Sequence, residues 1–183
     1  MGDREAFDAL VLRYQARIYR LARILARGDT RDAEDLAQDT FIRAYRGMGR
    51  FRQDSTFRTW LHRIALNVIW SHLSRSRQRA PHVGLEPAED GAGPAAHEPA
   101  SPRDDVEEAL IRRQVIDRAL ATLSTDARVA ITLRDIQGLE YQEIATITGV
   151  PIGTVESRIF RARRRLRPLL EPLRPAGPRE PSG

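Results

Sequence analysis

Apolar residues recur at helical spacing in two long blocks of the chain, on either side of a central stretch that lacks any such period. The first stripe predicts a helix that ends near Arg27 and Gly28, where a glycine can terminate it. The apolar members of this stripe are Phe7, Leu10, Val11, Tyr14, Ile18, Leu21, Ala22 and Leu25.

Two further helices are predicted in the first block. One begins with an acid-rich turn after Thr30, which suits the positive end of a helix dipole. Its expected buried face is Ala33, Leu36, Ala37, Phe41, Ala44 and Tyr45. A loop at Gly47–Ser55 follows. The next helix is expected to turn Phe57, Trp60, Leu61, Ile64, Ala65, Val68 and Ile69 inward. No alternating strand pattern of useful length occurs, so the predicted fold is all-α.

The central stretch, 76–105, contains five prolines and no usable apolar period, which is typical of a flexible linker. It separates two small helical domains, expected at 1–75 and 106–172, and a disordered tail is expected at 173–183. The second domain is predicted to contain helices at about Val106–Ala121, Ser124–Ile136 and Tyr141–Thr148, and a last helix opening at Pro151, whose missing N–H suits a first helical turn.

The last two helices have the anatomy of a helix-turn-helix, with Gly149 supplying the left-handed turn residue. The expected core between them is Ile144, Ile147, Val150, Val155 and Ile159. The outward face of the second helix is expected to be Glu156, Ser157, Phe160, Arg161 and Arg164. Such a face fits the major groove of DNA, where arginine pairs with guanine edges. The competing interpretation is that these two helices form a structural helical hairpin whose basic face only contacts solvent.

Composition narrows the functional classes. The 183 residues carry a formal charge of +5, and all 30 basic residues are arginine. Without lysine or cysteine, a phosphate-loop lysine, a Schiff base, a disulfide and a thiol nucleophile are all excluded. The four histidines, His62, His72, His82 and His97, show no metal-ligand spacing. We therefore expect no enzyme activity, no metal and no cofactor.

No apolar run approaches the ~20 residues of a membrane span, so no direct membrane insertion is expected. The segment Met1–Glu5 lacks the layout of a signal peptide, and a cytoplasmic protein is the default.

Several segments of the chain resemble the motifs of a known protein family. The segments Ala130–Arg134, Gly138–Ala145 and Pro151–Arg163 resemble the approach and recognition helices of the promoter −35-binding domain of bacterial sigma factors. The segments Asp32–Tyr45, Phe51–Leu61 and Ile64–Asn67 resemble the sigma domain that binds polymerase and the −10 element. Two such domains joined by a short linker are similar to the extracytoplasmic-function (ECF) group of the sigma-70 family.

The resemblance implies three sets of site residues. Those implied to bind core RNA polymerase, through its β and β′ subunits, are Asp35, Gln38, Asp39 and Arg43. Those implied at the −10 DNA are Phe51, Arg52, Arg58, Arg63 and Asn67. Those implied at the −35 DNA are Thr154, Glu156, Ser157, Arg158, Phe160, Arg161, Arg164 and Arg165. For each, a surface or core role is the competing interpretation; Phe51 in particular equally suits a plug in the core.

The implied partners are core RNA polymerase, promoter DNA and an anti-sigma factor. The implied activity is promoter-specific initiation with melting of the −10 region. Family members usually carry about one more helix before the position of Gly2, so this chain is expected to be a minimal member or a shortened sequence. Glu156 is acidic where some relatives place a DNA-contacting arginine. The alternative function is a helix-turn-helix regulator that binds operator DNA without joining polymerase.

Overall fold

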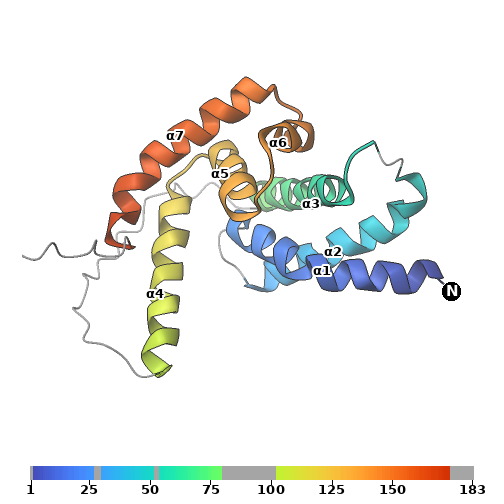
Figure 1. Ribbon diagram of the computed structural model, residues 1–183, viewed down its shortest axis with the longest axis horizontal. Coiled ribbons are helices and arrows are strands. Elements are labelled where there is room, and N and C mark those ends of the chain that lie inside the picture. The colour runs from blue at the N-terminus through green and yellow to red at the C-terminus, as the bar shows by residue number, and fades with distance from the viewer. Residues whose placement is uncertain (1, 27–29, 52–53, 80–101, 174–183) are drawn as a thin grey trace, which may run out of the picture.

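The computed structural model describes residues 2–26, 30–51, 54–79 and 102–173, and helices make up all of the regular structure in these ranges (Figure 1). An N-terminal module consists of α1 (Gly2–Leu25), α2 (Thr30–Gly47), the short 3-10 helix η1 (Met48–Arg50) and α3 (Phe57–Arg79). A C-terminal module consists of α4 (Pro102–Ala121), α5 (Thr125–Ile131), the π-helical turn η2 (Thr132–Ile136), α6 (Tyr141–Thr148), α7 (Ile152–Leu170) and the 3-10 helix η3 (Glu171–Leu173). The expectation of an all-α fold is confirmed.

Several predicted boundaries shift. The α3 helix continues to Arg79 and α4 already begins at Pro102, so both ends of the expected linker 76–105 are helical. The remainder of that linker, 80–101, lies outside the described residues, as does the tail from 174 onward. Pro151 is the N-cap of α7 and not a residue of its first turn.

The helix expected over Ser124–Ile136 is divided in two. Ser124 caps α5 by accepting the backbone N–H of Ala127 at 3.4 Å, and the last turn widens into η2 before Gly138 takes φ +68°. The predicted extent is nearly correct. Apolar periodicity does not distinguish a single π-helical turn from the α-helix that precedes it.

One buried position of α2 is predicted wrongly. Tyr45 is 55% exposed, its ring lying edge-on to Phe7 at the rim of the α1–α2 contact. Thr40 is buried in its place, because its hydroxyl donates to the Leu36 carbonyl at 2.7 Å and needs no other partner. A threonine whose hydroxyl is hydrogen-bonded to its own helix can be buried like an apolar residue, although the sequence pattern assigns it to the polar face.

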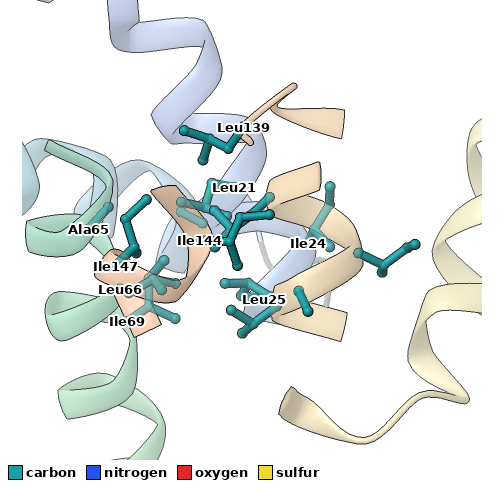
Figure 2. Packing of buried hydrophobic residues seen from close by; sticks show 14 of the residues in the cluster. Leu21, Ile24, Leu25, Ala65, Leu66, Ile69, Leu139, Ile144 and Ile147 are labelled. Carbon is teal, nitrogen blue, oxygen red and sulfur yellow. The ribbon is translucent and has the colours of Figure 1, made fainter. Parts of the chain in front are cut away.

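The two modules share one hydrophobic core. Figure 2 shows side chains of α1 and α3 meeting those of the α6 region; the labelled residues are Leu21, Ile24, Leu25, Ala65, Leu66, Ile69, Leu139, Ile144 and Ile147. In Figure 1, α6 lies against α3 while α4 projects away from this body. The C-terminal module therefore buries apolar surface of the N-terminal module, which the expectation of two linked domains did not include.

His62 is the one buried histidine of the described residues, and it lies on the face of α3 that the C-terminal module covers. Burial, the largest cause, lowers its pKa, and the nearby Arg58 and Arg17 guanidinium groups add to the shift. A hydrogen bond between its Nδ1 and the Arg58 carbonyl, at 2.7 Å, acts in the opposite sense. His62 is consequently neutral at pH 7.

This predicts an acid-sensitive fold. Below the unfolded-state histidine pKa of about 6.5, the unfolded chain takes up a proton that the folded chain resists, so the free energy of unfolding falls as the pH falls. Urea denaturation between pH 7.5 and 5.5 should show this loss, and His62→Gln should reduce it. His72→Gln is the matched control, because His72 is partly exposed and pairs with Asp32. Equal slopes for wild type and His62→Gln would contradict the assignment.

Candidate nucleic-acid interface

The helix-turn-helix is formed by α6, a tight turn and α7. Glu140 and Glu143 make a reciprocal capping box at the start of α6, which satisfies two backbone N–H groups there. Gly149 ends the helix at φ +70°, and its N–H donates to the Ala145 carbonyl at 2.8 Å. A residue with a side chain would be strained at this φ, so the predicted role of Gly149 is confirmed.

The α7 helix presents two different faces. Val155, Ile159, Ala162 and Leu166 are buried, as their spacing predicts. The opposite face carries exposed residues, namely Glu156, Ser157, Phe160, Arg161 and Arg164, which are the five predicted to point outward. Phe160 is 61% exposed and the Arg164 guanidinium lies 5.8 Å from its ring centroid. Aromatic and arginine side chains are both enriched at protein interfaces, so this face suits contact with another molecule.

The arginines of α7 divide into two groups. Arg158 pairs with Asp126 and Arg163 pairs with Asp135, at 2.6 Å in the second case, so both hold α7 against neighbouring segments. The Asp135 carboxylate raises the pKa of Arg163 through its hydrogen bond. Within the described ranges no ion pair with an acidic residue is seen for Arg161, Arg164 or Arg165.

Arg158 thus differs from its expected placement. Its side chain is only 22% exposed and is committed to Asp126, whereas the other members of the predicted −35 set lie on the open side of α7 or at its start. Thr154 is half-buried in the first turn, and its carbonyl accepts the Ser157 hydroxyl at 3.0 Å. Arg165 is exposed and directs its Nε toward the Thr122 hydroxyl at 3.4 Å.

Of the five predicted −10 residues, the four that lie in the described ranges, Phe51, Arg58, Arg63 and Asn67, have three different environments. Phe51 is half-buried among aromatic rings, 5.1 Å from Trp60 and 6.1 Å from Phe57 between centroids. Arg63 and Asn67 lie one turn apart on the exposed side of α3. Arg52 lies outside the described residues.

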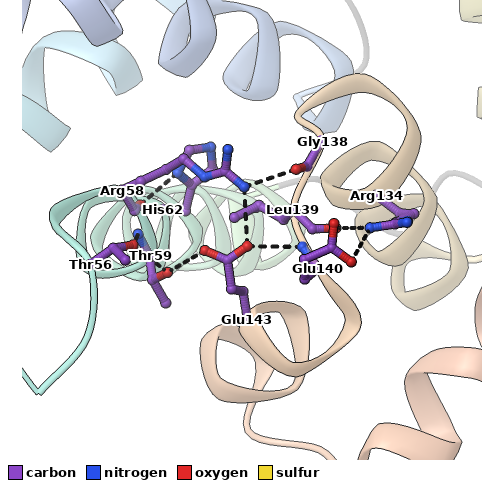
Figure 3. Close-up of polar contacts among 9 residues, drawn as sticks. All are labelled: Thr56, Arg58, Thr59, His62, Arg134, Gly138, Leu139, Glu140 and Glu143. Atoms are coloured by element: carbon purple, nitrogen blue, oxygen red, sulfur yellow. Dashed lines mark hydrogen bonds and ion pairs between the residues drawn. The ribbon is translucent and has the colours of Figure 1, made fainter.

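Arg58 has an unexpected environment, because it binds the C-terminal module. Its Nη2 donates to the Gly138 carbonyl at 2.8 Å and to a Glu143 carboxylate oxygen at 3.1 Å (Figure 3). The sequence gives no signal for this contact, since Arg58 and Glu143 are 85 positions apart. Arg58 and Arg63 therefore do not form one continuous basic surface in this arrangement.

The predicted polymerase-binding residues lie together on the outer side of α2. Asp35, Gln38 and Arg43 are exposed, and Asp39 pairs with Arg43 at 2.9 Å one turn further along. Gln38 also lines a groove of about 1090 Å³ between α1 and α2, together with Phe41, Ile42 and Tyr45. Mixed charge beside an apolar groove suits a protein partner.

Among the described residues, no group of three or more His, Asp or Glu side chains is arranged to hold a metal ion. The helices described here are also too short or too polar for any of them to cross a membrane.

These features define a two-module helical protein with a helix-turn-helix, and the comparisons identify its family. Residues 10–79 match the sigma-70 region 2 model, and residues 113–166 match the sigma-70 region 4 model. The chain belongs to the sigma-70 family of RNA polymerase sigma factors, in the ECF group.

Relatives and solved structures agree with this assignment. The chain is 41% identical over 175 residues to the RNA polymerase sigma-H factor of Pseudomonas aeruginosa, covering 94% of this chain and 90% of that protein. It is 41% identical over 177 residues to the ECF RNA polymerase sigma-E factor of Escherichia coli K12, with the same coverage.

The sigma factor RpoE in complex with the anti-sigma factor NepR from Bartonella quintana matches at a TM-score of 0.69 and 31% identity, covering 93% of this chain and 99% of that one. CnrH in complex with the cytosolic domain of CnrY matches at 0.64 and 30% identity, covering 93% and 91%.

The division of the α7 arginines gives a prediction about stability. Arg158→Ala should lower the free energy of unfolding by about 1 kcal/mol, because it removes a partly buried ion pair and the packing of the arginine stem. Arg161→Ala should change it by less than about 0.5 kcal/mol, as for an exposed residue away from structural contacts. Urea unfolding of both variants measures the difference, and equal losses would contradict the division.

Proposed function

We propose that this chain is a dissociable initiation subunit of RNA polymerase. It recognises the −35 element with α7, and the −10 element with Phe51 and the exposed side of α3. The observation that carries this proposal is the presence of both modules in one chain, a helix-turn-helix with an outward basic face and a region 2 match over residues 10–79. The chain itself is proposed to be non-enzymatic and to act in the cytoplasm, where the polymerase works.

The outer side of α2 is proposed to bind core polymerase. Asp35, Gln38 and Asp39 offer carboxylate and amide groups that are available for hydrogen bonds, and the apolar groove beside Gln38 adds surface that a partner helix can bury. An anti-sigma factor is proposed as a second partner, since the similar sigma factor RpoE from Bartonella quintana was solved in complex with the anti-sigma factor NepR.

The alternative, an operator-binding regulator, leaves the whole N-terminal module without a role. Pull-down with core RNA polymerase followed by run-off transcription separates the two functions. A sigma factor binds core enzyme and makes it initiate at a specific promoter. A regulator binds duplex DNA alone and does not program core enzyme.

Arg161 is expected to read a base of the −35 element, because it is exposed on α7 and its Nε donates to the Ser157 carbonyl of its own helix, at 3.2 Å. Arg161→Ala should cost about 1–3 kcal/mol on the cognate site and much less on a scrambled site. Arg165→Ala is the comparison, since a phosphate contact is lost equally on both sequences and flattens the salt dependence by about one counterion. Equal losses for Arg161→Ala on both duplexes would make it a phosphate contact instead.

Asn67 is expected to stabilise an unpaired base of the −10 region, together with Phe51. Extruding a base costs a few kcal/mol, which stacking and edge hydrogen bonds can offset. Asn67→Ala should keep core-polymerase binding, reduce transcription from duplex promoters, and recover in part on a template already mismatched across the −10 region. Ser74→Ala, two turns along the exposed side of α3, is the control. Full activity of Asn67→Ala on duplex DNA would overturn the role of this residue.

A further inference from the structure

Glu156 is the one acidic residue of α7, a helix that also carries six arginines. Its side chain is exposed on the outward face, one turn before Phe160. In Figure 1, α7 lies at the outer edge of the molecule, and its buried stripe packs on α4, α5 and α6. The Glu156 carboxylate is therefore presented to any molecule that binds the outward face.

No contact within the fold accounts for this carboxylate. The residues three and four positions away on α7 are Ile152, Gly153, Ile159 and Phe160. None of them is basic, so the helix offers Glu156 no ion pair at the usual spacing. In the ranges that the structure describes, no hydrogen bond or ion pair joins Glu156 to another side chain. Glu156 also lies beyond the first turn of α7, where an acidic residue would suit the helix dipole.

A carboxylate on a DNA-binding face is unfavourable unless it meets a hydrogen-bond donor. The phosphates of the duplex repel it, so beside the sugar-phosphate backbone it would weaken binding to every sequence. The edges of the bases are the other groups that this face can meet, and some of them carry donors. An acidic residue among arginines is thus suited to a base edge and poorly suited to a phosphate.

The position of Glu156 along α7 favours a base edge. The residues near the start of a recognition helix are those that contact bases in the major groove. A helical side chain also leans toward the N-terminus of its helix, which brings Glu156 over the turn that contains Gly153. A Cβ on Gly153 would meet no atom within 4 Å, so the space beside this turn is open.

The donor pattern of the major groove selects the base. Guanine and thymine present only acceptors there, which repel a carboxylate. Adenine presents the N6 amino group, but its N7 acceptor lies beside that donor. Cytosine presents the N4 amino group with no acceptor of its own on this edge, and it is the usual partner of a glutamate or aspartate.

We infer that Glu156 is a specificity-determining residue that accepts a hydrogen bond from the N4 amino group of one cytosine in the −35 element. Glu156 thereby makes α7 prefer a C·G pair at that position. This inference rests on the part of the proposed function in which α7 binds DNA, and it does not require the chain to be a polymerase subunit.

The first experiment measures the preferred base. The full-length chain, alone and bound to core RNA polymerase, selects duplexes from a library randomised across the −35 region, and the bound DNA is sequenced. Wild type should enrich cytosine at one position. Glu156→Gln has nearly the same size, and its amide matches N6 and N7 of adenine. It should change the preferred base at that position from cytosine to adenine, with a change of about tenfold in the affinity ratio, and leave the other positions as they are.

The second experiment separates recognition from a structural role. Fluorescence anisotropy measures the affinity of Glu156→Ala for the selected duplex, for the same duplex with the cytosine replaced, and for a scrambled duplex. The preference for cytosine should disappear, while binding to the scrambled duplex should tighten about twofold because a negative charge has left the DNA-binding face. A residue that only supports the fold would weaken binding to all three duplexes, and this result would overturn the inference.

Glu171→Gln is the matched control. It makes the same chemical change at the other end of α7, where Glu171 is the C-cap. It should leave the preferred base unchanged at every position. Identical base preferences for wild type and Glu156→Gln would overturn the role of Glu156, and a wild-type preference for adenine in place of cytosine would overturn the assignment of the base.

The outcomes distinguish the inference from the proposed function. If the chain does not program core polymerase but selects a duplex whose cytosine preference Glu156→Gln loses, the polymerase role fails and the inference stands. If the chain programs core polymerase at a promoter whose −35 preferences are the same in wild type and Glu156→Gln, the function stands and the inference fails. If neither the free chain nor its complex with polymerase selects any sequence, both fail.

Discussion

The apolar face of α3 is buried from two sides, by the N-terminal module and by the C-terminal module. Leu61, Ala65, Leu66 and Ile69 are all fully or almost fully buried, and they lie on one helix between α1 and α2 on one side and the α6 region on the other. Small helical modules with few aromatic residues have thin cores, so each gains stability when the other covers its exposed apolar surface. Packing of the C-terminal module on α3 therefore fixes the position of the helix-turn-helix and of the polar contacts around it.

The same burial joins the two modules. Leu21 and Leu25 of α1, like Leu66 of α3, are buried beside Ile144 and Ile147 in the present arrangement (Figure 2). Separation of the modules would expose that apolar surface to water, so its burial stabilises the packed arrangement.

Arginine performs several roles here because the chain contains no lysine. Arg158 and Arg163 fix α7 through carboxylates, Arg58 and Arg23 join the modules, and Arg161 and Arg164 remain on the open face of α7. The planar guanidinium makes paired hydrogen bonds with carboxylates and phosphates alike, so the same residue type serves packing and recognition. Which role a given arginine has depends on whether an acidic side chain lies within reach.

The sequence was sufficient to predict the helical fold, the helix-turn-helix and the buried stripe of α7. These depend on local periodicity and on a turn residue such as Gly149, which are readable within a window of about 18 residues. The resemblance of the two motif sets also gave the family, which the matches over 10–79 and 113–166 confirm. The exposed positions of Phe160 and Arg161 follow from the same helical period.

Packing between distant helices produces the shared core, the pairing of Arg58 with Glu143, the burial of His62 and the division of the α7 arginines. Each of these depends on residues that are distant in the chain, 85 positions apart for Arg58 and Glu143 and 32 for Arg158 and Asp126. Helical periodicity says which side of a helix is covered but not by what, because the covering segment is set by packing between helices. Charged residues on such faces look equally solvated in the sequence, and only the fold shows which of them meet.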